Sequence, residues 1–135
     1  MSRALTSIIA VLVLAACAPS PTPSPVQASP ALAATVTVAQ AAALRDAGAF
    51  VVDVREPDEW AAGHIPDATL IPLGELASRV GELPRDRSIV VVCRSGNRSA
   101  EGRDILLGAA FVAVTSLDGG MTDWAAAGMP IETGG

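Results

Sequence analysis

The hydrophobic residues of this chain fall into short continuous runs, which are separated by polar segments rich in glycine and proline. Four runs predict strands at 49–54, 68–71, 89–92 and 111–114, and an alternating segment predicts a shorter strand at 35–38. Runs without alternation are typical of strands that are buried on both faces, as the strands of a parallel sheet are.

Helices are predicted between these strands from the residues that begin and end them. The expected helices are 40–45 closed by Gly48, one that begins at Pro57 and ends before Gly63, 74–83 stopped by Pro84, one capped by Ser99 and running to Leu107, and 120–127 ended by Gly128. Strands that alternate with helices indicate an α/β domain whose sheet carries helices on both faces. A glycine within the fourth helix, Gly102, is expected to weaken it by about 1 kcal/mol relative to alanine.

The N-terminal segment does not share this alternation. Arg3 precedes an apolar run at 8–14 that ends in small residues, which is the order of an export signal. The run is shorter than the roughly 20 apolar residues that a membrane-spanning helix needs. Leu14-Ala15-Ala16-Cys17 resembles the lipobox of bacterial lipoproteins, which implies cleavage before Cys17 and a lipid on that cysteine. An ordinary cleaved secretory signal is the alternative.

The segment after Cys17 is rich in proline and carries no charge up to residue 34, so it is expected to stay extended. We therefore divide the chain into a signal peptide at 1–16, a lipidated cysteine with a tether at 17–34, and a folded domain at 35–135. The protein is expected to be exported and anchored by lipid to a bacterial membrane, facing the periplasm or the outside. Cys93 is then the only thiol of the mature protein.

Composition excludes several classes of function. The 135 residues include 9 basic and 14 acidic side chains, for a net charge of −5, which argues against a nucleic-acid partner. Two cysteines and one histidine cannot assemble a four-ligand zinc site. We predict neither a metal nor a cofactor.

One loop combines several features that favour a reactive thiolate. The most apolar strand, 89–92, leads directly into Cys93-Arg94-Ser95-Gly96-Asn97-Arg98-Ser99. The start of a helix supplies unpaired N–H groups and partial positive charge, and Gly96 tolerates the backbone angles that point N–H groups inward. Arg94 and Arg98 add two permanent positive charges. Together these groups favour a thiolate at Cys93 and attract a small oxyanion.

The alternative for Cys93 is a small buried side chain at the end of a strand, which is common for a free cysteine. A cysteine that merely packs has no use for a cationic loop rich in hydrogen-bond donors. The surrounding residues therefore favour the reactive interpretation.

At this point the chain resembles the rhodanese-like sulfurtransferases over about residues 35–133. The resemblance is carried by four motifs in order: Asp53-Val54-Arg55 with Glu59-Trp60; Gly63-His64-Ile65-Pro66-Asp67-Ala68; the loop from Cys93 to Ser99; and Asp118-Gly119-Gly120-Met121-Thr122-Asp123-Trp124 with Gly128-Met129-Pro130-Ile131. It implies a five-stranded parallel sheet flanked by helices on both faces. It also implies transfer of the outer sulfur of thiosulfate to cyanide or a thiol through a persulfide.

The resemblance assigns roles to individual residues. Cys93 is the expected nucleophile, and the expected substrate-binding residues are Arg94, Ser95, Gly96, Asn97, Arg98 and Ser99. Asp53 and Arg55 are expected to pair with other parts of the loop framework, with contact to the substrate as the alternative. His64 is expected to be a hydrogen-bonded element of the fold and not a general base.

Two other functions compete with this one. The first is a module that relays a persulfide to a protein partner and has little activity on free thiosulfate. The second is a cysteine phosphatase or arsenate reductase, whose phosphate cradle has five residues between the cysteine and the arginine. Only four residues separate Cys93 from Arg98, and this shorter loop favours attack on sulfur.

Overall fold

The structure is a computed structural model that describes residues 31–135 as alternating strands and helices. The elements are β1 (Thr35–Val36), α1 (Val38–Asp46), β2 (Phe50–Asp53), α2 (Pro57–Ala62), β3 (Thr69–Leu70), α3 (Leu73–Arg79), the 3-10 turn η1 (Val80–Glu82), β4 (Ile89–Val92), α4 (Asn97–Gly108), β5 (Val114–Leu117) and α5 (Gly120–Ala126). All strand pairs are parallel, in the order β1-β5-β4-β2-β3. The predicted fold class, an α/β domain with a five-stranded parallel sheet, is confirmed.

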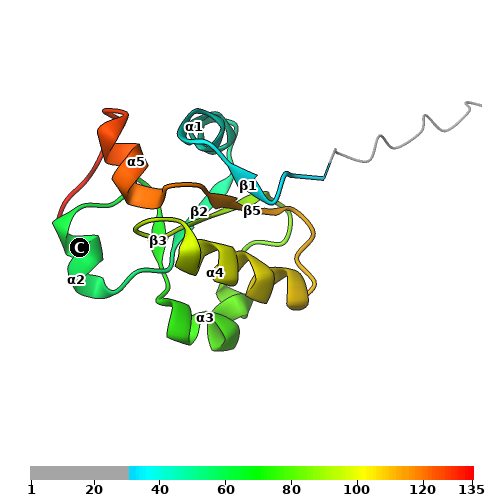
Figure 1. Ribbon diagram of the computed structural model, residues 1–135. Coiled ribbons are helices and arrows are strands. Elements are labelled where there is room, and N and C mark those ends of the chain that lie inside the picture. The colour runs from blue at the N-terminus through cyan, green and yellow to red at the C-terminus, as the bar shows by residue number, and fades with distance from the viewer. Residues whose placement is uncertain (1–30) are drawn as a thin grey trace, which may run out of the picture.

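Helices cover the sheet on both faces, with α1 and α5 on one side and α3 and α4 on the other (Figure 1). Successive residues of a strand serve opposite layers. On β4, Val90 and Val92 join the core under α1 and α5, whereas Ile89 and Val91 join the core under α3 and α4. Cys93 continues this second series, so its side chain points toward the side of the sheet that carries α4.

The last strand lies further along the chain than its hydrophobicity predicts. The apolar run at 111–114 indicates a strand, but Phe111 packs into the core ahead of β5, which begins at Val114. Thr115 and Ser116 form the middle of this strand, and both are fully buried. Their hydroxyls bond to the Ala33 carbonyl and to another serine, which makes burial of polar residues tolerable.

The predicted cap of the fourth helix is also wrong. Helix α4 begins at Asn97 after Gly96, which adopts the left-handed conformation at φ 104°. Ser99 lies inside the first turn, where its hydroxyl donates to the Gly96 carbonyl at 2.9 Å. The loop is therefore three residues shorter than a Ser99 cap implies, and the first turn of α4 comes closer to Cys93.

Gly102 has a packing role that the sequence did not reveal. A Cβ atom there would lie 3.0 Å from Cγ1 of Val91 and 3.4 Å from side-chain atoms of Leu76 and Val54. The missing side chain therefore lets α4 approach the sheet and α3 closely. The helix propensity lost at this position is exchanged for tight packing under the strand that carries Cys93.

The predicted signal peptide, Cys17 and most of the predicted tether lie outside the described residues. Two residues assigned to the tether nevertheless bond to the domain. The Ala34 carbonyl accepts from Ser116 N–H at 3.0 Å and from Arg103 at 3.0 Å, and the Ala33 carbonyl accepts from Thr115. No helix within residues 31–135 is long and apolar enough to cross a membrane.

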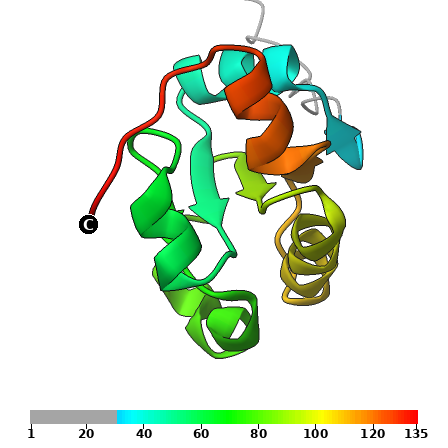
Figure 2. The same ribbon diagram turned by 60° about the vertical axis from the view of Figure 1, so that its left-hand side comes forward.

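The C-terminal segment folds back along α2 (Figure 2). Gly134 N–H donates to the Ala61 carbonyl at 2.9 Å, and His64 and Glu132 form an antiparallel bridge. These contacts hold α2 in place beside the sheet.

Candidate active site

Cys93 follows the central strand β4 at the edge where the parallel strands end. Ligands of open α/β sheets bind beyond this edge. The thiol is buried, with 1% of the residue exposed, and Gly96 N–H donates to its Sγ at 3.1 Å. The backbone N–H groups of Ser95 and Ser99 act on the same thiol by lowering its pKa. A single sulfur atom therefore lies within a partial ring of backbone donors.

Two serine hydroxyls lie behind the sulfur. Ser99 Oγ is 3.5 Å from Cys93 Sγ and 2.8 Å from Ser116 Oγ on β5. The Cys93 thiol donates to Ser99 Oγ, and the Ser99 hydroxyl donates its own proton to the Gly96 carbonyl at 2.9 Å. Ser116 was not identified from the sequence, since a serine inside a strand carries no recognisable signal of a site.

Opposing effects act on the pKa of Cys93. Burial raises the pKa of the Cys93 thiol, but the Ser99 hydroxyl and the N–H groups of Ser99, Ser95 and Gly96 stabilise the thiolate and outweigh burial. The pKa of Cys93 is thus below its ordinary value. A thiolate is the nucleophilic form of cysteine, so the loop activates this residue without a neighbouring general base.

The N-terminus of α5 holds the loop from the other side. Met121 N–H donates to the Cys93 carbonyl at 2.8 Å, and Thr122 donates to the Arg94 carbonyl through its N–H at 3.0 Å and its hydroxyl at 2.9 Å. Gly120 lets the two segments meet, since a Cβ atom there would overlap the Cys93 carbonyl oxygen. Gly120 thus allows α5 to hold the loop through the backbone of Cys93 and Arg94.

The two loop arginines have different surroundings. Arg94 is exposed, and its side chain has no hydrogen-bond or ion-pair partner among residues 31–135. Arg98 forms two hydrogen bonds to Glu59 of α2, at 2.8 and 2.7 Å. Both predicted arginines are present beside Cys93, but α2 supplies a carboxylate, distant in sequence, that compensates the charge of Arg98. Glu59 appeared in the sequence motifs without a role.

The remaining predicted residues of the loop lie at its rim. Ser95 and Asn97 are exposed, and Ser95 lowers the pKa of Cys93 through its backbone N–H. Asn97 is the first residue of α4.

Asp53 and Arg55 form a buried ion pair at the end of β2. Arg55 Nη2 lies 2.7 Å from Asp53 Oδ2, and both side chains are at most 6% exposed. Arg55 also donates to the carbonyls of Glu59 at 3.1 Å and Gly63 at 2.8 Å. The pair therefore anchors α2 in its first turn, at Glu59, and at Gly63 directly after its last residue.

His64 is packed within the fold, away from the sulfur's shell of donors. Its ring stacks on Trp60 at a centroid distance of 3.6 Å, and its Nδ1 lies 3.1 Å from the Trp60 carbonyl oxygen. These contacts attach the His64 side chain to the last turn of α2, so it has a structural role.

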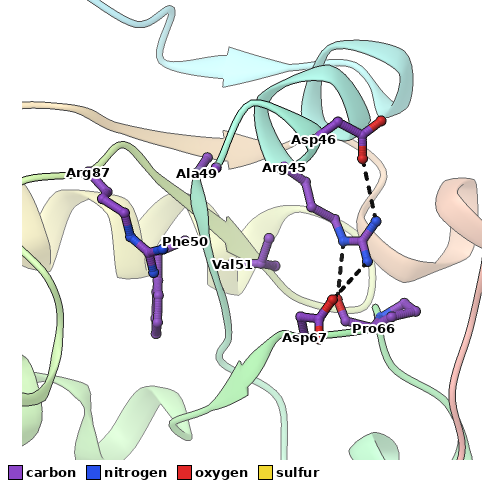
Figure 3. Close-up of a pocket in the computed structure, with 9 residues that line it drawn as sticks. Arg45, Asp46, Ala49, Phe50, Val51, Pro66, Asp67 and Arg87 are labelled. Carbon is purple, nitrogen blue, oxygen red and sulfur yellow. Dashed lines mark hydrogen bonds and ion pairs between the residues drawn. The ribbon is translucent and has the colours of Figure 1, made fainter.

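A separate pocket of about 370 Å³ lies near the edge where β2 begins, opposite to Cys93. Figure 3 shows Arg45 in this pocket, bonded to the Pro66 carbonyl and to Asp67, with Arg87 and Phe50 on the other side. The pocket contains no cysteine, serine or histidine. Residues 31–135 also contain no cluster of histidine, cysteine and carboxylate side chains suited to a metal ion.

Comparison with known proteins agrees with this geometry. The Rhodanese-like domain family matches residues 37–127. A sulfurtransferase of Allochromatium vinosum is 42% identical over 81 residues, covering 60% of this chain and 76% of that protein. The thiosulfate sulfurtransferase GlpE of Pseudomonas syringae pv. syringae is 41% identical over 85 residues, covering 63% of this chain and 80% of GlpE.

A solved structure shares the fold as well. The rhodanese-related protein of Thermoplasma volcanium aligns with a TM-score of 0.67 and 32% identity, over 73% of this chain and 96% of its own. The chain belongs to the family of rhodanese-like domains. The relatives from Allochromatium vinosum and Pseudomonas syringae are named sulfurtransferases, which supports a sulfurtransferase activity for this chain.

Proposed function

We propose that this protein transfers the outer sulfur of thiosulfate, or of a similar donor, to cyanide or a thiol through a persulfide on Cys93. The observation that carries the proposal is the loop around Cys93, in which backbone N–H groups and the Ser99 hydroxyl surround one buried sulfur. Such a loop stabilises a thiolate and can hold the added sulfur in the same ring of donors.

The first half-reaction begins with attack of the Cys93 thiolate on the outer sulfur of thiosulfate. A bond forms between the two sulfurs, the S–S bond of thiosulfate breaks, and its electron pair leaves with sulfite. Arg94, which is exposed beside the loop, is suited to stabilise the charge that develops on the departing group.

In the second half-reaction the acceptor attacks the outer sulfur of the Cys93 persulfide. Cyanide leaves as thiocyanate, a thiolate leaves as its own persulfide, and the Cys93 thiolate is restored. No side chain has to transfer a proton when Cys93 and the acceptor are both anions. This agrees with the lack of a histidine around Cys93 among the described residues.

The purified protein tests this proposal directly. It should release sulfite from thiosulfate, gain the mass of one sulfur atom, and lose both properties in Cys93→Ser. Sulfur loading without turnover on cyanide or small thiols would favour a persulfide relay to a protein partner. Hydrolysis of an aryl phosphate without sulfur loading would exclude the sulfurtransferase proposal.

We also propose that the protein is exported and anchored to a bacterial membrane through a lipid on Cys17. The charged, apolar and small-residue order of 1–16 and the lipobox-like Leu14-Ala15-Ala16-Cys17 support this. Lipid labelling in the native host should disappear in Cys17→Ala. A soluble, unlipidated mature product of the wild type would contradict the anchor.

A further inference from the structure

Glu59 and Arg98 form a two-armed ion pair at the edge of the Cys93 loop. Arg98 Nη1 donates to Oε2 at 2.8 Å and Nη2 donates to Oε1 at 2.7 Å. The side chains are 25% and 33% exposed, so the pair lies at the mouth of the site and not in its core. This geometry matches the planar fork of arginine to both carboxylate oxygens.

Glu59 is held in position independently of Arg98. Its carbonyl accepts from Arg55 at 3.1 Å, and Arg55 is fixed in turn by the buried Asp53 carboxylate. Its Oε2 also accepts from Glu56 N–H at 3.1 Å. Both the backbone carbonyl and the carboxylate of Glu59 are therefore held in place. This fixed position distinguishes the pair from an ion pair between two exposed, flexible side chains.

The pair changes the charge that an incoming substrate meets. Glu59 is ionised at neutral pH, because hydrogen bonds from Arg98 lower its pKa to about 2. It therefore cancels one of the two loop cations, and a Cys93 thiolate offsets the other. Both arms of the pair use Nη atoms, so Arg98 Nε–H has no acceptor among residues 31–135 and can still donate to a ligand.

We propose that Glu59 is a specificity-determining residue that sets how much negative charge the sulfur donor can carry. This inference rests on the proposed sulfurtransferase function. The Glu59 carboxylate disfavours doubly charged donors such as thiosulfate relative to singly charged ones, while the orientation of Arg98 keeps a hydrogen bond available to either. A thiosulfonate anion, R–SO2–S⁻, is a suitable singly charged donor, since the same attack on its outer sulfur releases a sulfinate.

The test compares kcat/KM for thiosulfate and for methanethiosulfonate in the wild type and in Glu59→Gln. Removing the carboxylate charge should raise the preference for thiosulfate about threefold to tenfold, mainly through a lower KM, and added salt should shrink this gain. Asp58→Asn is the matched control, because it removes the same charge from the same helix without touching Arg98. The control should change the preference by less than twofold.

Arg98→Gln provides a second variant with the opposite expected sign. It leaves the Glu59 charge uncompensated, so the preference should move toward methanethiosulfonate. An unchanged preference in Glu59→Gln, or an equal loss on both donors, would show that Glu59 only orients Arg98 and would overturn the inference. Absence of sulfite and sulfinate release in the wild type would instead refute the proposed function itself.

Discussion

Gly120 lies directly against the carbonyl oxygen of Cys93, and a Cβ atom at Gly120 would also lie 2.7 Å from the carbonyl carbon of Arg94. This contact lets α5 donate to the loop from Met121 and Thr122. The position of the reactive cysteine thus depends on a residue 27 positions later in the chain.

Gly120→Ala should therefore destabilise the protein by about 2–4 kcal/mol, from left-handed strain together with overpacking. Sulfur transfer should fall with it, because the loop must shift. Denaturant unfolding measures the first effect. Gly128→Ala is the matched control: its φ is similar, at 69° against 57°, but no atom lies within 4 Å of its Cβ position. Equal losses in the two variants would mean that backbone strain alone matters.

Ser99→Ala should raise the pKa of Cys93, because it removes the hydroxyl that stabilises the thiolate and leaves burial in place. The measurement is the pH dependence of Cys93 alkylation, whose midpoint should move to higher pH. Ser95→Ala is the control, since Ser95 acts through its N–H, which the substitution keeps. A shift as large in Ser95→Ala would contradict the geometry of the ring.

The Glu59–Arg98 pair should make stability depend on pH in the acid range. The pKa of Glu59 is lowered from 4.5 to about 2, so its contribution is complete above about pH 4.5 and is lost as the pH falls toward 2. With allowance for its partial exposure, Glu59→Gln should cost about 1–2 kcal/mol at pH 7. The difference from the wild type should vanish near pH 2. A constant difference across this range in unfolding experiments would rule out the ion pair as its cause.

Asp53→Asn should destabilise the protein by about 3 kcal/mol or more, because it leaves the buried Arg55 guanidinium without its counter-charge. Asp67→Asn breaks the ion pair with Arg45, but Asp67 is 94% exposed and the loss should be within the error of the measurement. Thermal or denaturant unfolding of both variants distinguishes an anchor of the fold from a surface pair.

Gly102→Ala should lower stability by about 1 kcal/mol, although alanine is the better helix former. The gain of about 1 kcal/mol in propensity is smaller than the cost of placing a methyl group 3.0 Å from the buried Val91 side chain. A more stable variant in denaturant unfolding would show that α4 can move away from the sheet at little cost.

The sequence was sufficient for those parts of the fold that depend on local pattern. The run at 89–92 matches β4, and Pro57 begins α2 as predicted. Strand β5 was misplaced because Thr115 and Ser116 are buried through partners that no local pattern reveals. Ser99 was misassigned as a cap because Gly96 already turns the chain into α4.

The loop around Cys93 could likewise be predicted from its own residues. The partners of its charged and polar side chains could not be predicted in this way. The charge of Arg98 is compensated by Glu59, 39 positions earlier, and the Ser99 hydroxyl is hydrogen-bonded to that of Ser116, 17 positions later. Contacts across such separations follow from strand order, which a single sequence does not specify.

The five parallel strands give the domain two unlike ends. The chain enters β1 from the side where the strands begin, away from the start of α4 (Figure 1). Ala33 and Ala34 bond to β5 at that end, whereas Cys93 follows the last residue of β4 at the opposite end. The described chain therefore begins on the side of the domain that faces away from the reactive thiol. If the domain is held to a surface from that side, the mouth of the loop is turned outward, toward donors and acceptors that approach from solution.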